Sequence, residues 1–149
     1  MIPDVPTVLG GIARSVALDL APEIRSAYGN LTVQLMSALL LMIAQEFDRA
    51  AARLAEENDA LRALFDEAQD TVTDEVLRAD LRQAAAPAAN PSLVVSQLRA
   101  RNRELRAVLV RLHAHVETLD SPAGRALDER VWAELIASTR RRQLDLAIG

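Results

Sequence analysis

Apolar side chains recur every three or four residues along most of the chain, and no segment alternates strictly between apolar and polar residues. This spacing places the apolar side chains on one face of an α-helix, whereas strict alternation would indicate a strand. The pattern therefore predicts an all-α protein, a helical bundle of about five helices. The segments that carry it are about 6–19, 31–68, 69–83, 91–119 and 125–142.

Prolines, glycines and capping side chains predict where these helices begin and end. Pro22 is expected to kink the first helix or to open a short second piece. Gly29 is typical of a helix stop, and Asn30 could cap the helix that follows. A capping side chain before a proline is a good start signal, because proline fits the first helical turn. The other expected caps are Asp70 or Thr71, Asn90 before Pro91, and Asp120 or Ser121 before Pro122.

The segment 31–68 contains no proline or glycine over 38 residues. As one helix it would be about 57 Å long. A compact chain of 149 residues has a radius of gyration of about 15 Å, so the helix would be longer than such a chain is wide. We therefore expect an elongated bundle, or a long helix that a partner chain helps to cover. A third apolar column along this segment supports a multi-helix bundle rather than a two-stranded pair. That column holds Met36, Ile43, Ala50 and Leu64, and Glu57 interrupts it.

One short phrase occurs twice, as EENDALRALF at 56–65 and ARNRELRAVL at 100–109. Both copies fall in segments with apolar residues at seven-residue spacing. Asn58 and Asn102 occupy the same column of that repeat, where the other residues are mostly apolar. A single asparagine at such a position fixes the register between helices at some cost in stability. The sequence therefore predicts that the two asparagines pair.

The positions of the two asparagines favour an antiparallel arrangement of the long segments, 31–68 and 91–119. Each asparagine would lie about 15 Å from a common end of the pair. Glu57 and Arg101 precede the asparagines and would then face one another, in agreement with an acidic stretch at 56–70 and a basic one at 99–111. The alternative is that the repeated phrase is a coincidence between two exposed helices.

Composition limits what the protein can be. With 149 residues, of which 50% are hydrophobic and 26% charged, the chain suits a single globular domain, 1–149. The absence of cysteine excludes disulfides, thiolate nucleophiles and cysteine-ligated metals. A net charge of −4 gives no overall attraction to nucleic acid or anionic lipid. The start lacks the pattern of a signal peptide, and the apolar run 35–44 is too short to span a bilayer, so we expect a cytoplasmic protein without membrane contact.

Few residues suggest chemistry. The best metal-ligand candidates are His113 and Glu117, which lie four residues apart on one helix face. Dinuclear metal bundles use Glu-x-x-His pairs, and neither histidine follows a glutamate at that spacing. Phosphate-binding loops and serine-nucleophile motifs are also missing. The arginines of 99–106 lie on more than one helix face, so salt bridges explain them better than nucleic-acid binding. We therefore expect no metal and no cofactor.

These observations favour a non-enzymatic interaction protein. It would act as a homo-oligomer, most simply a dimer, or as an accessory subunit of another protein. The alternative is a small binding module that holds an apolar or acyl ligand in the bundle core. An exposed apolar surface would favour the first hypothesis, and an enclosed cavity would favour the second.

Overall fold

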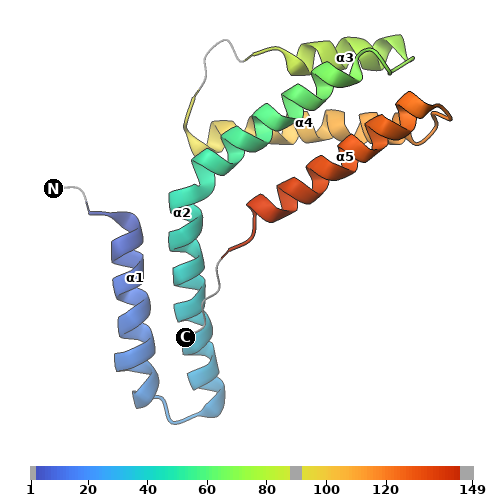
Figure 1. Ribbon diagram of the computed structural model, residues 1–149. Coiled ribbons are helices and arrows are strands. Elements are labelled where there is room, and N and C mark those ends of the chain that lie inside the picture. The colour runs from blue at the N-terminus through green and yellow to red at the C-terminus, as the bar shows by residue number, and fades with distance from the viewer. Residues whose placement is uncertain (1–2, 88–91, 145–149) are drawn as a thin grey trace. The chain divides into compact units, whose positions relative to one another are not determined.

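The computed structural model describes residues 3–87 and 92–144, and within these ranges it contains α-helices and no strand. The helices are α1 (Val5–Ser15), α2 (Ala27–Ala68), α3 (Glu75–Ala85), α4 (Val95–Val116) and α5 (Pro122–Arg141) (Figure 1). A π-helical turn, Val16–Leu20, and a 3-10 turn, Ala21–Glu23, lead from α1 towards α2. The prediction of an all-α fold with about five helices is confirmed.

Side-chain caps start α1, α3 and α5. Asp4 accepts a hydrogen bond from the Thr7 N–H at the start of α1. Ser121 caps α5, as expected, by accepting from the Gly124 N–H. The cap of α3 is Asp74, not Asp70 or Thr71. The hydrogen bond from the Leu77 N–H holds the pKa of Asp74 below its ordinary value.

The predicted boundary at Gly29 and Asn30 is wrong, because both residues lie inside the first turn of α2. The Ser26 hydroxyl accepts a hydrogen bond from the Gly29 N–H instead. Glycine suits this position because a Cβ would lie 2.7 Å from Ile24 Cγ2. Asn30 donates to the Ala21 carbonyl at 3.0 Å and so fixes the preceding turn.

The expected start at Asn90 and Pro91 lies outside the described residues. Within them, α4 begins at Val95, where Val94 provides no side-chain cap. The Ser92 hydroxyl accepts a hydrogen bond from the Val94 N–H just before the helix.

The contacts of the chain separate it into two compact units, and the division falls within α2. We call residues 3–50 the hairpin and residues 51–143 the bundle. The hairpin contains α1 and the first half of α2, and the bundle contains the rest of α2 with α3, α4 and α5. The expectation of a single folding domain stays a prediction.

The bundle has a continuous hydrophobic core. Leucines supply most of it, together with Phe65 and Val131, which are fully buried. The seven-residue column of α4 contributes Leu105 and Leu112, both with no exposed surface. The helices of this unit therefore pack through the apolar faces that the sequence pattern predicts.

Within the bundle, α2 and α4 run in the same direction. Asn102 on α4 hydrogen-bonds Asn58 on α2. Further along both helices, the Thr73 N–H beyond the end of α2 lies 3.4 Å from Nε2 of His115 near the end of α4. The predicted antiparallel pairing of the two long segments is therefore wrong. Helix α3 returns along α4, so the chain reverses twice between α2 and α4 and regains its direction.

The hairpin is built differently, because its interior consists of small side chains. The Ser37 hydroxyl donates to the Ala13 carbonyl at 2.9 Å, so α1 and the first half of α2 lie antiparallel and close together (Figure 1). The buried residues are Ala13, Ala21, Val33, Ser37, Ala44 and Ala50. Most of the larger Leu, Ile, Met and Phe side chains of this unit are exposed, whereas Leu9, Ile24, Leu40 and Met42 are partly buried.

Two glycines should respond in opposite ways to replacement by alanine. At Gly124 an added Cβ would lie 2.6 Å from Leu119 Cβ, so Gly124→Ala should lower the free energy of unfolding by about 1 kcal/mol. At Gly11 an added Cβ would meet nothing within 4 Å. Gly11→Ala should stabilise α1 by about 1 kcal/mol through helix propensity. Urea unfolding followed by circular dichroism measures the free energy of unfolding of both variants. If both substitutions raised it, or both lowered it, the environments described for the two glycines would be contradicted.

Candidate functional site

A small group of polar side chains lies buried inside the bundle. Glu57 has no exposed surface, and Asn58, Asn102 and Ser138 are at most 5% exposed. Buried polar groups persist in folded proteins when hydrogen bonds replace their contacts with water. We call these four residues the polar centre.

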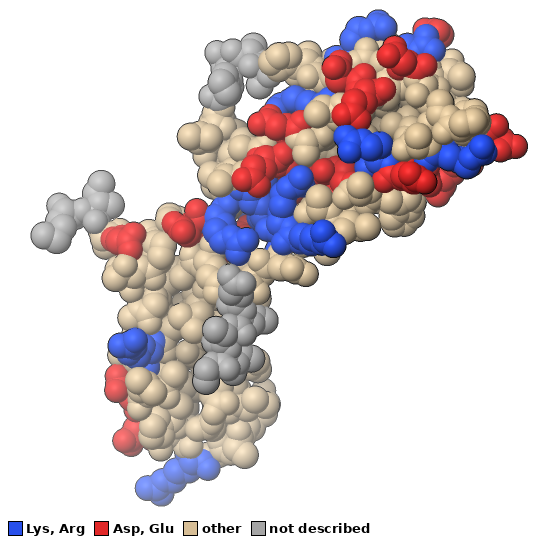
Figure 2. All heavy atoms as spheres, viewed as in Figure 1, with Lys and Arg blue, Asp and Glu red and all other residues tan. Residues whose placement is uncertain are grey.

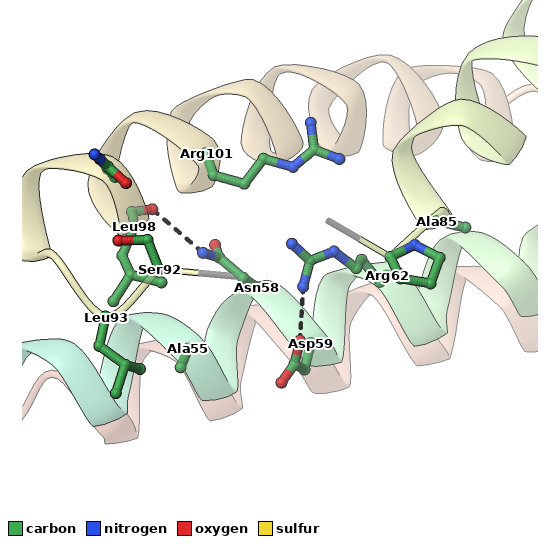
Figure 3. Close-up of a pocket in the computed structure, with 11 residues that line it drawn as sticks. Ala55, Asn58, Asp59, Arg62, Ala85, Ser92, Leu93, Leu98 and Arg101 are labelled. Atoms are coloured by element: carbon green, nitrogen blue, oxygen red, sulfur yellow. Dashed lines mark hydrogen bonds and ion pairs between the residues drawn. The ribbon is translucent and has the colours of Figure 1, made fainter. Parts of the chain in front are cut away.

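The two asparagines of the polar centre bond to each other. Asn102 Nδ2 donates to Asn58 Oδ1 at 3.0 Å, and Asn58 Nδ2 donates to the Leu98 carbonyl at 3.2 Å. Figure 3 shows the Asn58 side chain reaching from α2 to the backbone at Leu98. The structure thus places the two sequence-predicted residues together, within a parallel pair of helices. Their role in setting the register stays a prediction.

Glu57 on α2 binds side chains from α4, from α5 and from the residue that follows α5. It accepts hydrogen bonds from Arg106 on α4 at 2.6 Å, from Ser138 on α5 at 3.0 Å, and from Arg142 at 2.7 and 2.9 Å. Hydrogen bonds between charged groups are roughly twice as strong as neutral ones. Glu57 therefore fixes α5 against α2 and α4.

Two opposing effects act on the pKa of Glu57. Burial by itself would raise the pKa, because it disfavours the charged form. Hydrogen bonds from Arg142 and Arg106, the charge of Arg142, and the Ser138 hydroxyl all lower it. The net pKa lies below the ordinary value, so Glu57 is a carboxylate at neutral pH and has no proton to donate in general acid catalysis.

The expected pair of Glu57 with Arg101 does not form. Arg101 donates instead to Glu104 at 3.0 Å and to the Ala84 carbonyl on α3 at 3.3 Å. The expectation assumed antiparallel helices, in which the residues preceding the asparagines face each other. In the parallel pair, Arg106 is the α4 residue whose guanidinium reaches Glu57.

The other cross-helix ion pairs lie on the bundle surface. Arg111 donates to Asp80 on α3, and Arg130 on α5 binds the Glu67 carboxylate of α2 through several contacts near 3.0 Å. Arginines from two helices therefore neutralise acidic residues of α2: Arg130 on α5 binds Glu67, and Arg106 on α4 binds Glu57. Exposed pairs of this kind contribute little to stability.

The structure places the metal-ligand candidates His113 and Glu117 close together at the end of α4. His113 Nε2 lies 3.7 Å from Glu117 Oε1 and 3.5 Å from Asp128 Oδ1. The His113 ring also meets the edge of Trp132, with ring centres 5.3 Å apart. Among the described residues, no group of three His, Asp or Glu side chains could hold a metal ion.

A half-open groove of about 660 Å³ lies beside the polar centre, between α2, the end of α3 and the start of α4 (Figure 3). Its apolar walls include Ala55, Ala85, Leu93 and Leu98. Two arginines lie along it, and one of them, Arg62, already donates to Asp59 at 2.6 Å. The groove has the size of a small-molecule site, with apolar walls and polar groups at one side.

The hairpin carries the largest exposed apolar surface of the described residues. Thirteen of their exposed large apolar side chains belong to the hairpin and six to the bundle. On the face shown in Figure 2, charged side chains crowd the bundle but are few on the hairpin. Residues 26–45 contain no charged residue at all. By length and composition alone, α2 could also cross a membrane.

Comparisons with protein-family models, with curated proteins and with solved structures found no match for this chain.

Proposed function

We propose that the protein is a non-enzymatic, cytoplasmic interaction protein, and that the apolar surface of the hairpin is where it binds another polypeptide. The observation that carries this proposal is the reversed distribution of side-chain size in the hairpin. Its fully buried positions hold small residues and one valine, and most of its large apolar side chains lie at its surface. A soluble helix pair that acted alone would bury the large side chains, because their burial contributes most to stability.

The amount of apolar surface supports the same proposal. Thirteen large side chains that are about half exposed amount to on the order of 1,000 Å² of apolar surface. Covering the hairpin with a second polypeptide would remove this surface from water.

The bundle would act as the stable part of the molecule. Its core is closed, and the polar centre joins α2, α4 and α5 through buried hydrogen bonds. A binding surface is more specific when a rigid element presents it. In this proposal α2 belongs to both units and carries the binding surface on its first half.

The proposal can be tested with two matched variants of α2. Ile43 and Leu41 are both about half exposed, and they lie two residues apart on opposite sides of the helix. Native mass spectrometry of the protein from its own host should show a bound polypeptide, either another protein or a further copy of the chain. Ile43→Asp should remove it, and Leu41→Asp should not. A monomer under all conditions, or equal effects of the two substitutions, would contradict the proposal.

The groove beside the polar centre favours a second candidate function, the binding of a small apolar or acyl ligand. Its volume and apolar walls fit an aliphatic chain, and its arginines could contact a carboxylate. Native mass spectrometry should then show a retained small molecule. Leu98→Trp, which fills the groove, should abolish retention, whereas Val110→Trp on the exposed side of α4 should not. Protein that carries no small molecule in either form would rule this candidate out.

A further inference from the structure

The groove of the bundle has an apolar end and a charged end. Helix α2 lines it along one strip, two turns and roughly 10 Å long. The strip consists of Ala55, Asn58, Asp59 and Arg62. In Figure 3, Ala55 and Leu93 lie at one end of the strip and Arg62 lies at the other. A molecule that lies lengthwise in the groove would therefore meet apolar side chains at one end and a guanidinium group at the other.

The apolar end leaves a large side chain in water. Leu93 lines the groove just before α4 and is 78% exposed. An aliphatic chain that lay between Ala55, Leu93 and Leu98 would remove these side chains from water, which is favourable. At roughly 1.2 Å per bond of an extended chain, the strip of α2 has room for about eight carbons.

The charged end contains an arginine whose pairing is incomplete. The Arg62 side chain is only 18% exposed, whereas its partner Asp59 is 75% exposed. Nε of Arg62 is buried, and no described residue accepts a hydrogen bond from it. An ion pair with an exposed carboxylate contributes little to stability. Arg62 is therefore a largely buried cation that a second acceptor would stabilise.

A second arginine lies on the opposite wall of the groove. Figure 3 shows the guanidinium group of Arg101 on the α4 side, at the same end as that of Arg62. Glu104 and the Ala84 carbonyl hold Arg101 there, at 3.0 and 3.3 Å. The charged residues that line the groove are these two arginines and Asp59, which leaves one net positive charge. A ligand with a single negative charge would balance it.

From the two ends together we infer that the groove binds a single-chain carboxylate, an aliphatic molecule of about eight carbons whose head group lies between Arg62 and Arg101. The two oxygens of a carboxylate match the forked donors of a guanidinium group. A phosphate monoester fits less well, because it carries roughly 1.5–2 negative charges. The inference rests on the second candidate function, the binding of a small ligand in the groove, and names the class of that ligand.

Asp59 should compete with the ligand for Arg62. Both carboxylates would bind the same guanidinium group, but Asp59 does so in water and the ligand would do so inside the groove. Ionic hydrogen bonds are stronger where water is partly excluded. The ligand should therefore displace Asp59, at a cost that lowers its affinity.

The preference for a carboxylate can be measured with two probes of equal length, octanoate and 1-octanol. Nuclear magnetic resonance titration of isotope-labelled protein gives both affinities and shows which amide signals shift. Octanoate should bind about tenfold more tightly, because hydrogen bonds to a charged group are stronger. The largest shifts should come from residues of the groove, such as Leu93 and Leu98. Equal affinities would overturn the inference, and tighter binding of octyl phosphate than of octanoate would overturn the carboxylate as head group.

Three variants test the role of Arg62. Arg62→Gln should weaken octanoate binding about tenfold and leave 1-octanol binding unchanged. Arg103→Gln is the matched control, because it changes the net charge equally at an exposed position two residues beyond Arg101. Asp59→Asn should strengthen octanoate binding severalfold, since it removes the competing carboxylate. Equal weakening by Arg62→Gln and Arg103→Gln would contradict the inference, and circular dichroism checks that each variant is folded.

The probes also separate this inference from the candidate function on which it rests. If 1-octanol binds as tightly as octanoate, and Leu98→Trp prevents both from binding, the groove is a site for apolar ligands without a carboxylate preference. The inference then fails and the candidate function stands. If neither probe shifts the signals of the groove, the inference is overturned. The candidate function is overturned as well if protein from its own host retains no small molecule.

Discussion

Replacing Glu57 with glutamine is expected to lower the free energy of unfolding of the bundle by about 3 kcal/mol. The carboxylate is fully buried and accepts hydrogen bonds from two arginines and a serine. Glutamine keeps the shape but removes the negative charge that the guanidinium groups need. Arg106 and Arg142 are 37% and 43% exposed, so water partly solvates them and the loss should stay at the lower end of values for buried ion pairs.

The same carboxylate should make stability depend on pH in acid. The pKa of Glu57 is lower in the folded protein than its ordinary value of 4.5. A lowered pKa contributes stability that is fully present above the unfolded-state pKa and is lost as the pH falls through the folded-state pKa. Unfolding should therefore become easier below about pH 4.5.

Urea unfolding at a series of pH values between 7 and 3 measures both effects. Glu57→Gln should be less stable than the wild type at pH 7, and the two should converge as the pH falls. Glu104→Gln is the matched control, because Glu104 is largely exposed and pairs with Arg101 on the same helix. A constant difference between Glu57→Gln and the wild type at every pH would show that packing, rather than charge, accounts for the loss.

The second large effect is expected at the asparagine pair. Asn58→Leu should cost about 2 kcal/mol, because it leaves Asn102 Nδ2 buried without its acceptor. Asn102→Leu should lower the free energy of unfolding by a similar amount, because it leaves Asn58 Oδ1 buried without its donor. The double variant should lose less than the sum of the two, since it replaces both partners with apolar groups. Chemical unfolding of all four proteins gives the coupling energy.

The double variant also tests whether the pair sets the register of the helices. If it does, the double variant should keep its helix content but show broadened or duplicated amide signals in nuclear magnetic resonance spectra, because α2 and α4 could then slide past each other. Additive single effects, together with a single sharp set of signals in the double variant, would mean that the pair has no register role.

Local periodicity predicts the helices but not the direction in which they pair. Spacing of apolar residues identifies a helix and its buried face, and these depend on neighbours in the sequence. Direction depends on how often the chain reverses between two helices. The pattern at 69–83 indicates a helix, which the structure places at Glu75–Ala85. Two reversals around this helix make α2 and α4 parallel, although the asparagine positions agree with either direction.

Two residues around Glu57 have no signal in the sequence pattern. Nothing in the pattern distinguishes Ser138 from other polar residues of a helix. The sequence explains Arg142 only as a cation near a helix C-terminus, where positive charge is favourable. Glu57 itself does have a signal, because it interrupts an otherwise apolar column. A carboxylate at a buried position needs cationic partners. That argument predicts a buried ion cluster from sequence but cannot choose among the arginines.

The partners of Glu57 also determine when the bundle can close during synthesis on the ribosome. Ser138 and Arg142 follow Glu57 by 81 and 85 residues. At roughly 5–20 residues per second, the nascent chain would carry this carboxylate for several seconds before α5 emerges. Helix α1 and the first half of α2 emerge much earlier, because they precede Ala51 in the chain. The exposed apolar side chains of the hairpin therefore leave the ribosome well before the partners of Glu57 that lie at the end of α5.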